Sequence, residues 1–315
     1  MKWEPAIYEH KAALINKSPV EVANSAELLA ESVLTEYEIY QADYITVGLD
    51  VYNIEAEALG AELTVAGENE CPDLAGLLYD LNNLPEQLEL PATSDSGRFQ
   101  LLIDAAKKVK EVIGDKAAVR VAASGPITMA AKLVGLEDLI MSLCMEDGNA
   151  VKLLEFTTQI AEKWCACLRD NGLDAIIFDS MVSPPMFSPD MYENIVLPLH
   201  KRLMSQLEQS GQSERELVIG GNTSKIANLM KQTEANIILC DYASDATAFK
   251  TNLGDDKNIQ VRRNINPALL RENNKALSEK FQQELFLFTN PIAGTGILPY
   301  NFISKNLLKF ICEIR

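Results

Sequence analysis

Residues 218–223 read VIGGNT, and residues 293–299 read AGTGILP. Each of these glycine-rich turns follows an apolar, strand-like run and precedes a helix-like run. Glycine suits such turns because it has no side chain to restrict the backbone, and it lets another group approach closely. In a barrel of alternating strands and helices, the turns that follow the strands carry the functional residues. The two turns therefore predict both a fold and the place of a site.

Short apolar runs alternate with long amphipathic segments along the whole chain. Seven strand–helix units without a Ser- or Pro-rich linker predict one α/β domain over residues 1–315, a (β/α)8-type TIM barrel with an irregular or short eighth strand. An open doubly wound sheet is the alternative, but no GxGxxG or P-loop pattern supports its nucleotide-binding version. The expected strands are 43–49, 118–123, 175–178, 217–219, 236–239, 259–262 and 285–288.

The segments outside these units have signals of their own. Residues 1–42 are expected to form an N-terminal helical arm, in which residues 24–27 (NSAE) give an N-cap and capping-box pattern. Pro126, Pro189 and Pro267 each suit the first turn of a helix, where the missing N–H costs nothing. Residues 70–97 are rich in Pro, Asn and Ser, which predicts a loop excursion near the barrel mouth or a plain surface loop.

Composition limits the function. The net charge is −17 and the pI about 4.6, so binding to nucleic acid or to an anionic membrane is not expected. This acidity indicates either simple solubility or a face that docks a basic partner. No apolar leader or membrane-length run is present, which favours a cytoplasmic protein. The six cysteines lie in no CxxC or Cys/His spacing, so we expect mostly buried thiols in a reducing compartment.

Three aspartates end predicted strands: Asp50, Asp179 and Asp241. Side chains at these positions face the site of a barrel. A carboxylate there can accept N–H or O–H groups of a ligand, or act as a general base. The alternative is that each aspartate caps the helix or loop that follows. We treat the three as candidate catalytic residues.

Other polar residues at the strand ends are candidates for substrate binding. Arg262 and Arg263 are adjacent, so only one of them faces the lumen of the barrel. The inward arginine suits a ligand carboxylate or phosphate, or an internal ion pair. His10 and His200 have no Cys or Glu at ligand spacing, so we expect both to be structural and predict no His/Cys metal site. The candidate substrate-binding residues are Tyr52, Asn53, Glu57, Ser124, Asn222, Arg263, Asn264 and Thr295.

Asn222 and Glu57 each have a second interpretation. Asn222 suits a ligand contact or the cap of the following helix. Glu57 and Glu55 suit ligand contacts or acids favoured at a helix start.

Several stretches match one known superfamily in their order and spacing. They include residues 48–60, 124–128, 172–179, 221–223, 264–267 and 294–299. On these stretches the chain resembles the uroporphyrinogen decarboxylase superfamily. That superfamily includes zinc methyltransferases, which move methyl groups between corrinoid proteins and thiols.

The chain departs from the superfamily where chemistry is done. The methyltransferases read His-x-Cys-Gly-Asn in the first glycine turn and add a third ligand, Cys, in the last turn. Here Val218 and Gly220 stand for the first pair, and Thr295 lies near the third, so the resemblance does not extend to the usual zinc site. The decarboxylases carry an arginine-rich stretch and a Gly-His-Gly turn, which are also absent. Asp50 matches the aspartate that binds pyrrole N–H groups in the decarboxylases.

The resemblance implies a methyltransferase that works without the usual zinc site. It would move a methyl group between a small donor or acceptor, such as a methylamine or methyl ether, and a corrinoid protein. The chain itself would bind no cofactor, because the corrinoid would come from the partner. The alternatives are a tetrapyrrole decarboxylase and a non-catalytic binding protein on an enzyme fold.

Overall fold

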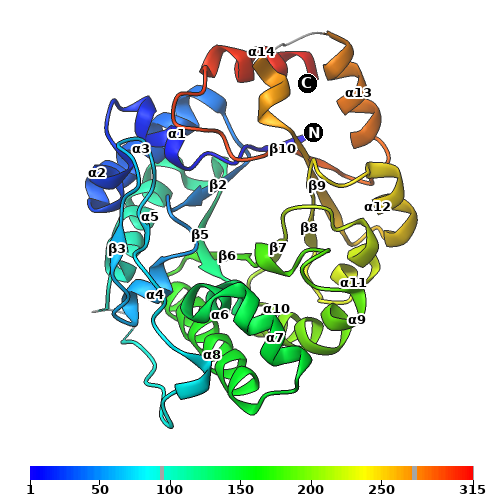
Figure 1. The fold of residues 1–315 in the computed structure, drawn as a ribbon. Coiled ribbons are helices and arrows are strands. Elements are labelled where there is room, and N and C mark those ends of the chain that lie inside the picture. Colours follow the sequence, from blue (N-terminus) through cyan, green and yellow to red (C-terminus); the bar gives the residue numbers. More distant parts are fainter. Residues whose placement is uncertain (93–95, 272–274, 315) are drawn as a thin grey trace.

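The structure is a computed structural model that describes residues 1–92, 96–271 and 275–314. Its main sheet has eight parallel strands in the order β1-β10-β9-β8-β7-β6-β5-β2. The two ends of this order meet, because Asp43 N donates to Trp3 O at 2.9 Å and Trp3 N donates to Asp43 Oδ2 at 2.7 Å. The expected TIM barrel is thereby confirmed (Figure 1). The strands are β1 Lys2–Glu4, β2 Tyr44–Val47, β5 Ala118–Ser124, β6 Asp174–Phe178, β7 Glu216–Val218, β8 Ile237–Cys240, β9 Gln260–Ile265 and β10 Ile292–Thr295.

Helices surround the strands on the outside of the barrel (Figure 1). The longer helices bury an apolar face in the core, as the amphipathic spacing predicts. In the described part of the chain, no helix is both long and apolar enough to span a membrane. The helices are α1 Glu9–Leu14, α2 Pro19–Ala23, α3 Ala26–Tyr40, α4 Ile54–Ala58, α5 Phe99–Ile113, α6 Pro126–Val134, α7 Leu136–Cys144, α8 Gly148–Asp170, α9 Pro189–Met191, the π-helix η4 Tyr192–Val196, α10 Leu197–Gln209, α11 Ala227–Lys231, α12 Ala246–Leu253, α13 Lys275–Leu285 and α14 Ser304–Ile314.

The prediction of a seventh strand at residues 285–288 is wrong. Leu285 ends helix α13, and Phe286 lies exposed beyond it. The apolar run reflects a helix C-terminus whose Leu285 and Phe288 are buried, whose Leu287 packs partly against the core, and whose Phe286 is exposed. The last strand is β10, which contains the start of the second glycine turn.

The N-terminal arm differs from its expected helical form. Residues 2–4 form β1, which pairs with β10 and supplies the eighth strand that the sequence did not reveal. Three residues are too short to show a periodic pattern. Ser25 caps α3, as expected, by accepting from Leu28 N. The reciprocal capping box lies one helix earlier, between Ser18 and Glu21.

The excursion at residues 70–97 has two parts. Its first residues form the short strand β4 (Asp73–Leu74), which pairs with β3 (Leu63–Thr64) beside the barrel mouth. The rest runs along the outer helices, where Leu78 N donates to Leu133 O and Lys163 Nζ donates to Pro91 O. Residues 93–95 lie outside the described residues.

The barrel interior is filled in layers by side chains that alternate along the strands. An apolar layer of Tyr44, Ile237 and Ile292 closes the end at which the strands begin. A layer around Ala122, Phe178, Val218 and Leu239 lies toward the other end. Between them lies a buried ion quartet: Glu4, Arg120, Glu216 and Arg262.

Candidate functional site

A cavity of about 180 Å³ opens where the strands end, and we call it the mouth cavity. Its wall alternates apolar and hydrogen-bonding side chains, as is usual for a small-molecule site. It lies at the barrel end where sequence reasoning placed the chemistry. The apolar lining residues are Ala6, Phe178, Val218, Leu239 and Ile297, and the polar ones are Tyr8, Tyr52, Ser180, Asp241, Tyr242, Arg262 and Asn264.

A second pocket of about 580 Å³ lies beside the mouth cavity and shares Tyr8, Tyr52 and Ile297 with it. We call it the outer pocket. It lies between the strand ends and the β3–β4 hairpin. Four carboxylates line it, whereas the one basic lining residue is Lys132. Its acidic residues are Glu9, Asp50, Glu70 and Asp73.

Asp241 is the expected carboxylate that the structure places in the wall of the mouth cavity. It follows β8 directly. One carboxylate oxygen accepts from Gly221 N at 3.0 Å, and the other accepts from Asn264 Nδ2 at 3.3 Å. The first glycine turn therefore holds this carboxylate in place through its backbone.

Asp179 has the capping role that was the alternative interpretation. Its carboxylate accepts from Thr128 N at 2.7 Å and from Ile127 N at 3.3 Å, at the N-terminus of α6. It also lies 2.9 Å from His200 Nε2 and is fully buried. Asp179 is not part of the wall of either pocket. His200 in turn contacts Tyr192 in the core, which agrees with a structural role.

Asp50 lines the outer pocket but its charge is already paired. Arg98 donates to both of its oxygens, at 2.6 and 3.0 Å, and a third N–H of Arg98 reaches Glu57 at 2.6 Å. Burial raises the pKa of Asp50, and the Arg98 charge opposes that rise. Glu57 is thus an ion-pair partner at the start of α4 in this structure.

Three further candidates surround the pockets. The Tyr52 hydroxyl lies 2.8 Å from Ser180 Oγ, and burial raises the pKa of Tyr52, so it stays protonated near neutral pH. Asn53 lines the outer pocket and donates to Pro72 O at 2.7 Å. Ser124 instead donates its hydroxyl to the buried Glu55 at 2.8 Å.

Arg262, and not Arg263, is the arginine inside the barrel. Arg262 forms part of the mouth cavity wall and of the buried ion quartet. Arg263 points outward, where it binds Glu284 at 2.7 Å and the carbonyl of Ser244 at 3.0 Å. The alternation along β9 fixes this outcome, but the sequence does not reveal which of two adjacent residues faces inward.

The remaining candidates belong to the turns themselves. Asn264 lines the mouth cavity and holds Asp241. Thr295 is fully buried and accepts from Ala6 N at 3.0 Å, which ties β10 to the residues after β1. Asn222 lies outside both pocket walls, and its side chain accepts from Ser224 N, as a capping residue does.

Two polar residues of the mouth cavity wall, Tyr8 and Tyr242, were not among the residues expected from the sequence. Tyr242 directly follows Asp241, so extending that strand-end assignment by one residue would have found it. Tyr8 follows β1, which was not recognised as a strand. Burial raises the pKa of Tyr8 well above its ordinary value, so its hydroxyl remains a donor. Ile297 of the second glycine turn was not expected either, whereas Arg262 was considered as the alternative to Arg263.

The residues around the mouth cavity do not fit a zinc ion of the kind that the resemblance implies. Val218 and Gly220 offer no donor side chain where His and Cys would stand. Over residues 1–92, 96–271 and 275–314, no three His, Cys, Asp or Glu side chains lie close enough together to hold a metal ion. No step below is therefore assigned to such an ion.

Comparisons with known proteins agree with this architecture. The model of the family "Uroporphyrinogen decarboxylase (URO-D)" matches residues 6–287. Methylcobamide:CoM methyltransferase MtbA of Methanosarcina mazei is 24% identical over 244 residues, 77% of this chain and 70% of that protein. Uroporphyrinogen decarboxylase of Nostoc punctiforme is 22% identical over 252 residues, 78% of this chain and 69% of that protein.

A solved structure extends the likeness to the whole fold. It is a methyltransferase from Methanosarcina mazei, with a TM-score of 0.84 at 19% identity, and the match covers 99% of this chain and 92% of that one. At this identity the match shows the fold alone.

Proposed function

Because the chain belongs to the uroporphyrinogen decarboxylase (URO-D) family, we propose that it is a methyltransferase of that family. It moves a methyl group between a small molecule in the mouth cavity and a corrinoid protein, without a His/Cys zinc site. The observation that carries the proposal is the mouth cavity itself. It is small, partly polar and placed at the strand ends of a barrel whose relatives include methylcobamide:CoM methyltransferases.

The chemistry of methyl transfer suits the residues of the cavity wall. When a methyl group leaves a heteroatom toward an electron-rich acceptor, that heteroatom keeps the bonding electron pair and takes up a proton. Asp241 is placed to orient the leaving group or to relay that proton. The hydroxyl of Tyr52 is a neutral donor beside it. Asp50 remains a candidate for binding a ligand in the outer pocket. Asp179 would act indirectly, by holding the end of β6 against the N-terminus of α6.

Size and charge disfavour the decarboxylase alternative. A uroporphyrinogen carries up to eight carboxylates. The outer pocket presents Glu9 and Glu70, which form no salt bridge in the described part of the chain, beside Asp50 and Asp73, which pair with Arg98 and Lys132. Like charges in a partly buried pocket oppose binding. A small neutral or cationic donor, such as a methyl ether or a methylamine, meets no such repulsion.

The test is methyl transfer followed by the absorbance change of free cobalamin, with a panel of methylated amines, ethers and thiols. The protein is treated with a chelator beforehand, and its metal content is measured. We expect turnover that survives chelation. Turnover only after zinc is added, or none with any donor, would contradict the proposal. Formation of coproporphyrinogen from uroporphyrinogen would favour the decarboxylase instead.

Asp241→Asn provides the matched variant, with Asp104→Asn on the exposed face of α5 as its control. We expect Asp241→Asn to lower kcat by about 10²–10⁴-fold, the range for loss of a general acid or base. The control should transfer methyl groups at the wild-type rate. Circular dichroism shows whether each variant folds. Equal rates in a folded Asp241→Asn protein would remove Asp241 from the proposal.

A further inference from the structure

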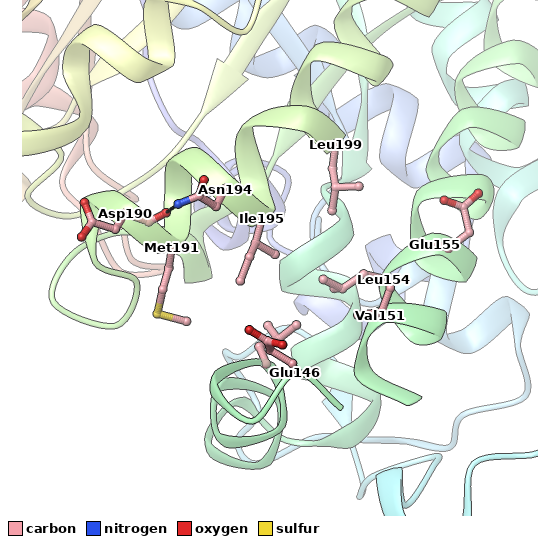
Figure 2. Close-up of a pocket in the computed structure, with 10 residues that line it drawn as sticks. Glu146, Val151, Leu154, Glu155, Asp190, Met191, Asn194, Ile195 and Leu199 are labelled. Carbon is pink, nitrogen blue, oxygen red and sulfur yellow. Dashed lines mark hydrogen bonds between the residues drawn. The ribbon is translucent and has the colours of Figure 1, made fainter. Parts of the chain in front are cut away.

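An apolar groove lies outside the barrel and shares no lining residue with the mouth cavity. It has a volume of about 640 Å³ and runs between the first turns of α8 and the segment formed by α9, η4 and the start of α10 (Figure 2). Its apolar side chains come from both walls and face one another. They are Leu143, Val151, Leu154, Met191, Ile195 and Leu199.

The length of the groove matches a short helix, and ion pairs of Arg202 close one of its ends. On one wall its residues run from Asp190 to Leu199, which on a helix spans roughly 14 Å at 1.5 Å per residue. Beyond Leu199, Arg202 binds Glu155 at 2.8 Å and Glu162 at 2.5 Å and so joins α10 to α8 at this end of the groove. Two to three turns of a helix would fill the space.

The rim of the groove is acidic. Figure 2 shows Asp190, Glu146 and Glu155 around the apolar centre. No lysine or arginine is among the lining residues, and in the described part of the chain neither Asp190 nor Glu146 forms a salt bridge. The three rim acids are part of a chain whose net charge is −17. Glu155 pairs with Arg202, so the surface combines an apolar floor with two carboxylates, Asp190 and Glu146, whose charge no described salt bridge compensates.

Apolar side chains at the groove are open to solvent. Val151 in the groove is 59% exposed, Met191 lines it, and Met145, next to the lining residue Glu146, is 68% exposed. Flexible methionines are common where a surface accepts an amphipathic helix. Helix recognition in such grooves uses apolar anchors at helical spacing.

We propose that this groove docks a short amphipathic helix of a partner protein, with an apolar face and lysine or arginine at its flanks. Charge complementarity selects this occupant. A second copy of the chain would place the same acidic rim against itself in a two-fold interface, with like charges opposed.

The groove lies at the barrel end that holds the mouth cavity, because α9 follows β6 through the loop after its carboxyl end. This inference does not depend on the methyltransferase activity.

The test uses a synthetic 18-residue Leu/Lys peptide with leucines at helical i, i+3, i+4 and i+7 spacing, labelled for fluorescence anisotropy. A Leu/Glu peptide of the same pattern is the charge control. Val151→Lys changes the groove, and Val112→Lys is the matched control, because Val112 is 63% exposed on α5. Both substitutions add the same charge to the same residue type.

We expect the Leu/Lys peptide to bind the wild type and the Leu/Glu peptide not to bind. Val151→Lys should weaken binding at least about tenfold, which corresponds to 1.4 kcal/mol, and Val112→Lys should not. Glu146→Gln with Asp190→Asn should flatten the salt dependence. No binding, or equal loss in both lysine variants, would overturn the proposal. So would dimerisation of the wild type, seen by light scattering, that Val151→Lys abolishes, because the groove would then be a self-interface.

Discussion

Arg262 belongs to two environments at once. Its guanidinium pairs with Glu4 and Glu216 inside the barrel, and the same residue forms part of the mouth cavity wall. Two carboxylates and two guanidiniums balance within the quartet. The nearby carboxylates hold the pKa of Arg262 above its ordinary value, so the charge is permanent. Arg262 therefore contributes to the cavity wall a guanidinium whose charge is already balanced by Glu4 and Glu216.

Removal of Arg262 tests that balance. Arg262→Met should lower the free energy of unfolding by about 3–5 kcal/mol, because it leaves a buried carboxylate without compensation. Adding Glu216→Gln should recover part of the loss. Urea unfolding of the two single variants and the double variant measures the coupling. Strict additivity of the two effects would contradict a coupled quartet.

Glu36 gives the fold a pH dependence. Burial raises its pKa to about 7, and the partly opposing charge of Lys11 lies 3.3 Å away. Because the folded-state pKa lies above the usual value, the stability that protonated Glu36 contributes is complete below about pH 4.5 and is lost as pH rises through about 7.

The measurement compares the wild type with Glu36→Gln between pH 5 and pH 8 by urea unfolding. The free energy of unfolding of Glu36→Gln, minus that of the wild type, should increase as pH rises. The increase should be at most about 3 kcal/mol. Other buried carboxylates titrate in both proteins and cancel in the difference. A difference that does not vary with pH would show that Glu36 has an ordinary pKa.

At the scale of elements, Gly125 joins β5 to α6 under a steric limit. A Cβ at this position would lie 2.3 Å from Cβ of Asp179, the residue that caps α6. The glycine thus allows the capping carboxylate to approach the helix N-terminus. Proline at position 126 then fixes the first helical turn. The proline is recognisable in the sequence. The contact with Asp179 is not, because Asp179 follows the neighbouring strand β6.

Gly125→Ala should destabilise the protein by about 1–3 kcal/mol through this overlap. Gly148→Ala is the control, since no atom lies within 4 Å of its added Cβ at the start of α8. We expect the control to be neutral or to raise stability by about 0.4–1 kcal/mol. Thermal unfolding of both variants checks the pair. An unchanged melting temperature in Gly125→Ala would mean that Asp179 shifts without cost.

At the scale of the whole molecule, three residues close the barrel. β1 pairs with β10 on one side and meets the start of β2 on the other. It also carries Trp3 into the core and Glu4 into the quartet. Closure of the barrel therefore depends on β1, which lies in the segment that the sequence predicts to be an N-terminal helical arm.

Removal of residues 1–5 should abolish a single cooperative unfolding transition, because it opens the sheet and leaves Arg120 and Arg262 short of a carboxylate. Removal of Met1 alone, which is exposed, should leave the transition unchanged. Circular dichroism on heating distinguishes the two. A truncated chain that melts like the full chain would show that β1 is dispensable.

The sequence by itself determined the barrel, most of its strands and the barrel end at which the mouth cavity opens. Those features depend on local periodicity and on glycine and proline at turns, which a chain carries in its own order. The tertiary structure alone decided which side chains meet. In the structure Arg262 points into the barrel and Arg263 points outward. Asp179 caps the N-terminus of α6, and Asp241 lies in the cavity wall. Such choices depend on register and on neighbours far away in sequence, and no local pattern encodes them.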